Sequence, residues 1–111
     1  MKDIIYDKLV RDNIPNIIKQ DNCIPIYREL SDDEFLNYLL DKDSEELEEL
    51  REVSSYVEAR KELADKLEVL ITIANYYGYS LEDIQKEAKE KRNKNGGFEK
   101  RLLLERVIEN D

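Results

Sequence analysis

Hydrophobic residues recur at helical spacing through the middle of the chain. After Ser31 they fall at positions 35, 36, 39, 40, 47 and 50. This spacing places them along one side of a helix, so it predicts a long amphipathic helix that ends at about Glu52. Ser31 and Glu34 match a capping box, in which each side chain accepts a hydrogen bond from the other residue's backbone N–H group. The helix should therefore begin directly after Ser31.

Two more helices are predicted downstream. A second capping-box match begins at Ser55, and apolar residues follow at positions 63, 67, 70, 71 and 74. This helix should stop near Gly78, because glycine readily adopts the left-handed conformation that ends helices. Ser80 opens a third helix, which should run to about Arg92, before a turn at positions 95–97.

The two ends of the chain are less regular. Asp12 or Asn13 can cap a short helix with Pro15 in its first turn. Positions 24–30 alternate only roughly between apolar and polar residues, and Pro25 favours an edge strand or an extended segment there. Positions 98–107 fit a short strand or a helix. A length of 111 residues without an internal repeat predicts one domain, residues 1–111.

Two acidic pairs lie on the two long helices. Glu46 and Glu49 are three residues apart on the first, and Glu62 and Asp65 have the same spacing on the second. Residues three apart are neighbours on a helix surface, so each pair can present two carboxylates side by side. The intervening chain is long enough for one helix to end and the next to return. Four carboxylates from two antiparallel helices would supply oxygen ligands for a hard divalent ion such as Mg²⁺.

The position of Glu46 is unusual for a charged residue. On a helical wheel it falls on the apolar stripe that contains Leu39, and Glu49 lies at the border of that stripe. A charge on a buried face is costly unless it is paired or bound to a metal. Glu45 lies to the side and Glu48 points nearly the opposite way, so we interpret these two as surface charge.

The second long helix is apolar on more than one side. Its main stripe contains Leu63 and Leu67, and Glu62 and Asp65 lie opposite. That opposite side continues with apolar residues at positions 69, 73 and 76, so both faces should be covered, which suggests a partner subunit. Glu62 and Asp65 would then line the mouth of a groove. The alternative is a solvated acidic face, because glutamate-rich surface helices often contain such pairs by chance.

Composition narrows the classes of partner. The formal net charge of −9 argues against binding a nucleic-acid polymer. A single cysteine, Cys23, excludes an internal disulfide and fits a reducing, cytoplasmic setting. No apolar stretch approaches the roughly 20 residues that a membrane span needs, so no membrane association is expected. The chain has no histidine, which excludes imidazole as a general base.

Positive charge gathers near the carboxyl end. Residues 86–101 hold seven bases and three acids, and the bases flank Gly96 and Gly97. A glycine pair lets a backbone approach a phosphate closely, and lysine and arginine neutralise phosphate charge. The alternative is structural: basic residues complement the dipole at the end of a helix, and glycine terminates it.

Three blocks of sequence, taken in order, resemble the MazG-like, all-α nucleoside triphosphate pyrophosphohydrolases. Glu45–Leu50 followed by Glu62–Asp65 looks like the E-x-x-E then E-x-x-D signature of that superfamily. Tyr6–Pro15 and Lys91–Arg101 are similar to a subgroup described as phosphoribosyl-ATP pyrophosphohydrolase-like. The chain departs from the expected pattern at Asn95, where an arginine should precede the glycine pair.

The resemblance implies both a fold and an activity. The fold would be an all-α helical bundle, built from an antiparallel helix pair plus a third helix, with a short extended N-terminal segment. It would assemble as a homodimer or homotetramer. The activity would be hydrolysis of a nucleotide between its α and β phosphates, which gives a nucleoside monophosphate and pyrophosphate, as in house-cleaning of the nucleotide pool.

The resemblance also assigns roles by position. The expected ligands of Mg²⁺, for which Mn²⁺ can substitute, are Glu46, Glu49, Glu62 and Asp65. The expected phosphate-binding residues are Lys91, Arg92 and Lys94, with Lys8 and Arg11 as further candidates. Glu46 or Glu49 would orient or deprotonate the attacking water.

Two alternatives to this activity stay open at this point. One is an enzyme dedicated to phosphoribosyl-ATP. The other is a non-catalytic helical module that oligomerises or binds a partner, with its acids serving only as a solubilising surface.

Overall fold

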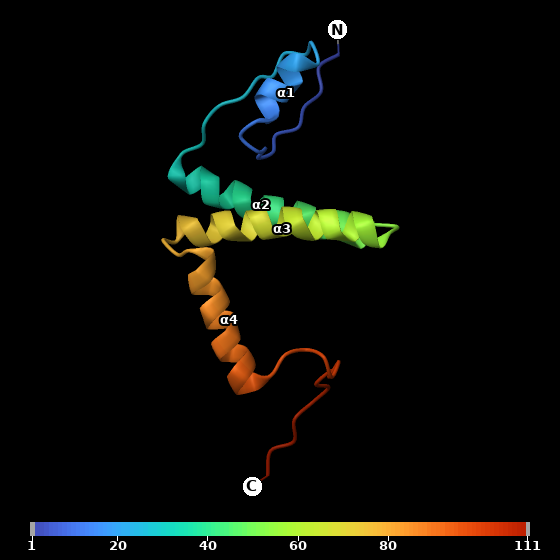
Figure 1. The fold of residues 1–111 in the computed structure, drawn as a ribbon, viewed down its shortest axis with the longest axis vertical. Coiled ribbons are helices and arrows are strands. Elements are labelled where there is room, and N and C mark those ends of the chain that lie inside the picture. The colour runs from blue at the N-terminus through green and yellow to red at the C-terminus, as the bar shows by residue number, and fades with distance from the viewer. Residues whose placement is uncertain (1, 111) are drawn as a thin grey trace.

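The computed structural model describes residues 2–110, and four helices lie within that range (Figure 1). They are α1 (Ile14–Gln20), α2 (Asp32–Arg51), α3 (Tyr56–Tyr76) and α4 (Leu81–Asn95). Between residues 2 and 110 the chain forms no strand, which confirms the expected all-α class. Positions 24–30 form no strand, and positions 98–107 form neither the strand nor the helix that their sequence allows.

Local capping signals set the starts of α2 and α4. Ser31 Oγ accepts a hydrogen bond from the backbone N–H of Glu34, whose carboxylate accepts from the Ser31 N–H at 3.1 Å. Ser80 and Asp83 form the same reciprocal pair at the start of α4, with distances of 2.9 and 3.1 Å. Each cap satisfies backbone donors that the first helical turn leaves without a partner.

The start of α3 is a variation on the predicted capping box. Ser55 Oγ accepts from the Glu58 N–H at 3.1 Å, as expected. The Glu58 carboxylate, however, accepts from the backbone N–H of Ser54 at 2.9 Å, one residue earlier than the box requires. At α1, Asn13 occupies the cap position without a side-chain hydrogen bond, and Pro15 lies in the first turn.

Helices α2 and α3 form an antiparallel hairpin and lie side by side (Figure 1). Four side chains in the described range are buried, and three of them are the apolar Leu39, Val69 and Ala74. The fourth is Glu46, which is 5% exposed. The Phe35 and Tyr76 rings meet edge to face with centroids 6.4 Å apart. This hairpin core is small, and a carboxylate occupies part of it.

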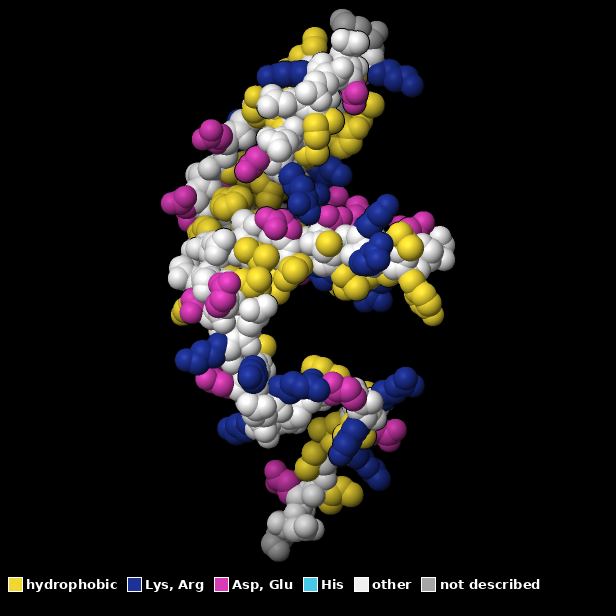
Figure 2. Space-filling view, in the orientation of Figure 1, with side chains coloured by type: hydrophobic (Ala, Val, Ile, Leu, Met, Phe, Trp, Pro, Cys, Tyr) yellow, Lys and Arg dark blue, Asp and Glu magenta, His cyan; other side chains and the backbone are white. Residues whose placement is uncertain are grey.

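Helix α3 turns an unexpected side towards α2. Within the predicted main stripe Ala74 is buried, but Leu63, Leu67 and Leu70 are 55%, 46% and 45% exposed, so most of the stripe is not covered. The side of α3 that carries Glu62, Asp65 and Val69 faces α2 instead. Figure 2 shows hydrophobic side chains on the α4 side of the hairpin and acidic ones on the side below the N-terminal segment.

Helix α4 begins at the end of α3 and projects away from the hairpin (Figure 1). The chain measures 70 × 35 × 27 Å, and its radius of gyration is 19.2 Å. A compact domain of this length would have a radius of about 13 Å. A single chain therefore does not close a bundle around its apolar surface. Across residues 2–110, none of the helices combines the length and apolar character that a membrane crossing requires.

Candidate metal centre

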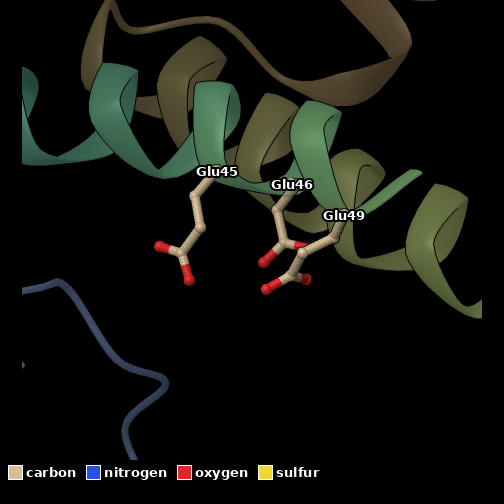
Figure 3. Close-up of side chains that lie close together, drawn as sticks. All are labelled: Glu45, Glu46 and Glu49. Atoms are coloured by element: carbon tan, nitrogen blue, oxygen red, sulfur yellow. The ribbon is translucent and has the colours of Figure 1, made fainter. Parts of the chain in front are cut away.

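The structure brings the four predicted carboxylates together across the hairpin. Glu46 from α2 and Glu62 and Asp65 from α3 each offer an oxygen, and these three atoms lie within 4.8 Å of one another. Glu45, Glu46 and Glu49 on α2 form a second group, in which one oxygen from each carboxylate again lies within 4.8 Å of the others (Figure 3). Glu46 belongs to both groups and therefore stands at the centre of the cluster.

Glu46 is the most constrained of these residues. Its side chain is only 6% exposed, and within the described chain its Oε2 atom has no hydrogen-bond partner. The nearest cation is Lys42, whose Nζ lies 3.7 Å from Glu46 Oε1. An ionised carboxylate in such a setting carries a large desolvation penalty. Burial, together with the carboxylates of Glu62 and Glu49, raises the pKa of Glu46 to about 7.

Glu62 shares this electrostatic crowding from the α3 side. Its Oε2 atom is also inaccessible to solvent and has no hydrogen-bond partner among the described residues. A hydrogen bond from the Glu46 carboxyl group lowers the pKa of Glu62. Burial and the carboxylates of Glu49 and Asp65 raise the same pKa by more, so the net shift is upward. Each of the two helices thus contributes a carboxylate oxygen without a hydrogen-bond partner to one cluster of negative charge.

Glu45 belongs to the cluster, which corrects its assignment as surface charge. It is partly buried and accepts hydrogen bonds from Lys8 at 3.1 Å and from Lys42 at 3.4 Å. Burial raises the pKa of Glu45, but Lys8 and Lys42 lower it by more. The signal in the sequence was Lys42, which precedes Glu45 by three residues and Glu46 by four. Glu48 does point to solvent, with a side chain that is 70% exposed.

The N-terminal segment places two cations over the carboxylates. Lys8 Nζ lies 3.1 Å from Glu45 Oε1, and Arg11 Nη2 lies 2.7 Å from Asp65 Oδ1. Contact with Glu45 raises the pKa of Lys8. A cavity of about 310 Å³ lies between this segment and the hairpin, and Lys8, Arg11, Glu46 and Asp65 line it. Acidic and basic groups therefore share one cavity. A second cavity, at the tip of the hairpin, has neither among its lining residues.

The predicted phosphate-binding residues of α4 are not part of this cavity. Lys91, Arg92 and Lys94 are exposed, and α4, the helix that carries them, projects away from the hairpin (Figure 1). The Arg92 guanidinium pairs with Glu99 across the glycine turn. It also lies so close to Gly97 that a Cβ atom there would collide with Arg92 Nη1. Within one chain, the absence of a side chain at Gly97 makes room for arginine.

The carboxylates suit a hard divalent cation. All the donors are carboxylate oxygens, which Mg²⁺, Mn²⁺ and Ca²⁺ prefer. An ion with ligands at about 2.1 Å holds opposite oxygens about 4.2 Å apart. Groups within 4.8 Å therefore reach that spacing through small side-chain rotations. A bound cation would also give the oxygens of Glu46 and Glu62 the partners that they lack.

Comparison of the chain with other proteins adds no relative to this description. Neither protein-family models, nor curated protein sequences, nor solved structures give a match. The chemistry of the site therefore has to be inferred from its own residues: five carboxylates, of which one is buried, and two cations on the N-terminal segment that covers them.

Proposed function

We propose that this protein is an Mg²⁺-dependent nucleotide pyrophosphohydrolase. It would hydrolyse nucleoside triphosphates between the α and β phosphates, to give a nucleoside monophosphate and pyrophosphate. The observation that carries this proposal is the buried Glu46, which has an oxygen without a hydrogen-bond partner and belongs to both groups of carboxylates. Lys42 approaches only Oε1 of this carboxylate, so at 5% exposure the Oε2 atom is left without a partner, and a bound cation would supply one.

The neighbouring cations favour a phosphate substrate over a simple ion store. Lys8 and Arg11 line the same cavity as Glu46 and Asp65. A polyphosphate bound to a metal presents both the ion and negative oxygens at once, and this cavity offers a partner to each. The resemblance of three sequence blocks to MazG-like enzymes points to the same class of substrate.

The positions of the residues indicate which role each would have in the reaction. Glu46, Glu49, Glu62 and Asp65 would hold Mg²⁺, which when bound supplies a Lewis acid for phosphate oxygens and acidifies a water ligand. Glu49 is exposed whereas Glu46 is buried, so Glu49 is the better placed to accept a proton from the attacking water. Lys8 and Arg11 would offset negative charge as pyrophosphate departs.

We further propose that the active form is a homodimer or homotetramer. Leu63, Leu67 and Leu70 form an exposed apolar row on α3, and the chain is far more extended than a compact domain. Burial of this row against another copy would complete the expected helical bundle. Because Lys91 and Arg92 lie away from the carboxylates of their own chain, they could bind substrate phosphate only at the site of another copy.

The function is tested by measuring pyrophosphate release with and without Mg²⁺. The panel comprises standard and modified nucleoside triphosphates together with phosphoribosyl-ATP. We expect Mg²⁺-dependent release that Glu46→Gln abolishes and Glu48→Gln leaves intact, because Glu48 lies on the same helix but points to solvent. Release from phosphoribosyl-ATP alone would instead identify a dedicated hydrolase.

The non-catalytic alternative draws its support from the exposed row on α3. A helical interaction module would use that surface and would need no metal. Such a protein would release no pyrophosphate from any compound in the panel, and Glu46→Gln would leave its self-association unchanged.

A further inference from the structure

The side chain of Arg11 pairs with one of the carboxylates proposed to bind the metal. Its Nη2 atom is 2.7 Å from Asp65 Oδ1, and Asp65 is one of the three carboxylates that meet at Glu46. A second observation indicates that this cluster binds a cation: Glu46 is buried, and one of its oxygens has no hydrogen-bond partner. A guanidinium and a divalent cation would therefore compete for Asp65.

The arginine can leave without disturbing the backbone. Its carbonyl oxygen accepts a hydrogen bond from the Ile14 N–H at 3.0 Å, which ties Arg11 to the start of α1. The side chain itself is 58% exposed and long enough to turn within the cavity. Release from Asp65 is thus a change of side-chain rotamer rather than an unfolding of the N-terminal segment.

On the assumption that the proposed function holds, we propose that Arg11 exchanges partners during the binding cycle. Without metal, Arg11 neutralises Asp65. When a divalent cation takes that carboxylate, the guanidinium turns to the phosphate oxygens of the nucleotide in the same cavity. Arg11 holds Asp65 through one hydrogen bond, whereas a phosphate group can accept two parallel hydrogen bonds from a guanidinium and carries more negative charge. Metal binding would therefore prepare the site for the polyphosphate.

This exchange has a signature that a merely structural ion pair lacks. Removal of a structural pair would loosen the site and weaken both metal and nucleotide binding. Removal of an exchanging arginine has opposite effects: the metal loses a competitor and binds more tightly, and the nucleotide loses a ligand and binds more weakly. The two signs can be measured separately.

The test is calorimetric titration of the full chain at a pH above the pKa of Glu46. Mn²⁺ is titrated first without nucleotide, and then a nucleotide with an α,β-methylene bridge, which cannot be hydrolysed there, is titrated at saturating Mn²⁺. For Arg11→Gln we expect Mn²⁺ to bind about 2- to 5-fold more tightly, the scale of one exposed ion pair. The nucleotide should bind at least about 10-fold more weakly.

Two further variants sharpen the test. Arg28→Gln removes another arginine of the N-terminal part, which pairs with Glu34 at 2.7 Å, and should behave as the wild type. Arg11→Lys keeps the charge but cannot bind phosphate through a planar fork, so its Mn²⁺ affinity should stay near that of the wild type while nucleotide affinity falls. Arg11→Lys also guards against misfolding of the glutamine variant.

The possible results separate the two proposals. Weaker Mn²⁺ binding by Arg11→Gln, or no change in either affinity, would overturn the exchange. The same pair of changes in Arg28→Gln would also overturn it, because the cause would then be a general loss of positive charge. Failure of the wild type to bind Mn²⁺ at all would remove the proposed function and the exchange together.

Discussion

Replacement of Glu46 by glutamine should stabilise the metal-free protein at neutral pH, although it removes a residue central to the proposed chemistry. In the folded chain the pKa of Glu46 is raised from 4.5 to about 7. The folded state therefore binds a proton more tightly than the unfolded chain does. The resulting stability is fully present below pH 4.5 and is lost as pH rises through about 7.

The size of this loss of stability follows from the difference between the ordinary and the raised pKa of Glu46. Each pH unit corresponds to about 1.4 kcal/mol, so the interval between 4.5 and about 7 corresponds to about 3 kcal/mol of unfolding free energy. Glu62 contributes in the same direction, because its pKa is also raised. Small domains have a total unfolding free energy of about 5–15 kcal/mol. Ionisation of one carboxylate thus removes a substantial fraction of the stability.

The measurement is urea unfolding, followed by the helical circular dichroism signal in the presence of a chelator, between about pH 5 and pH 8. This window avoids the acid range, where groups with lowered pKa such as Glu34, at about 2, act in the opposite direction. Wild type should lose stability across the window, whereas Glu46→Gln, which retains only the contribution of Glu62, should lose less and be the more stable of the two at the upper end of the window.

The matched control is Glu48→Gln, which lies on the same helix but is exposed and should retain the wild-type slope. Addition of Mg²⁺ above pH 7 should restore stability to the wild type and have little effect on Glu46→Gln. A wild-type protein whose stability does not change across the window would refute the reasoning, as would an equal slope in both variants.

Three other perturbations test separate parts of the structure. Glu62→Gln should weaken Mn²⁺ binding by at least about 10-fold in a calorimetric titration, whereas the exposed Glu68→Gln should not; equal losses would indicate a non-specific charge effect. Leu67→Glu should lower the mass of the assembly measured by sedimentation. It should not unfold the chain, since Leu67 is 46% exposed. An unchanged mass would argue against the exposed apolar row on α3 as an interface. Ser80→Ala should destabilise α4 by about 1 kcal/mol, seen as faster hydrogen exchange there but not in the α2–α3 hairpin. Equal acceleration in the hairpin would contradict an independently held α4.

The helix boundaries were predictable because their signals are local. Ser31 with Glu34, and Ser80, specify starts through hydrogen bonds that span only three residues. The end of α4 was placed three residues too early, since nothing in the side chains of positions 93–95 stops a helix before Gly96 adopts a φ of 86°. The edge strand that the pattern at positions 24–30 allowed does not form, because a strand needs a partner strand and the described chain contains none.

The site was predictable only in part, for reasons of tertiary packing. Glu46 could be identified because its position on an apolar stripe is a property of one helix. Glu45 was misassigned, because only the local Lys42 could be seen in the sequence; its contact with Lys8, 37 residues away, exists only in the folded chain. The orientation of α3 was equally non-local: with apolar residues on both sides, the sequence could not indicate which side would meet α2. The distance of Arg92 from the carboxylates likewise depends on the direction of α4.

The carboxylate cluster lies on a single hairpin, and this has a consequence for how the chain folds. All five acids occur between positions 45 and 65, so they approach one another as soon as α2 and α3 close. Hairpin closure is a local event and is therefore expected to be early. Mutual repulsion of the acids would then oppose the first step of folding rather than the last. A divalent cation, or a proton on Glu46, should accelerate refolding, so that the rate at which the chain acquires its structure depends on the same carboxylates that are proposed to bind the metal.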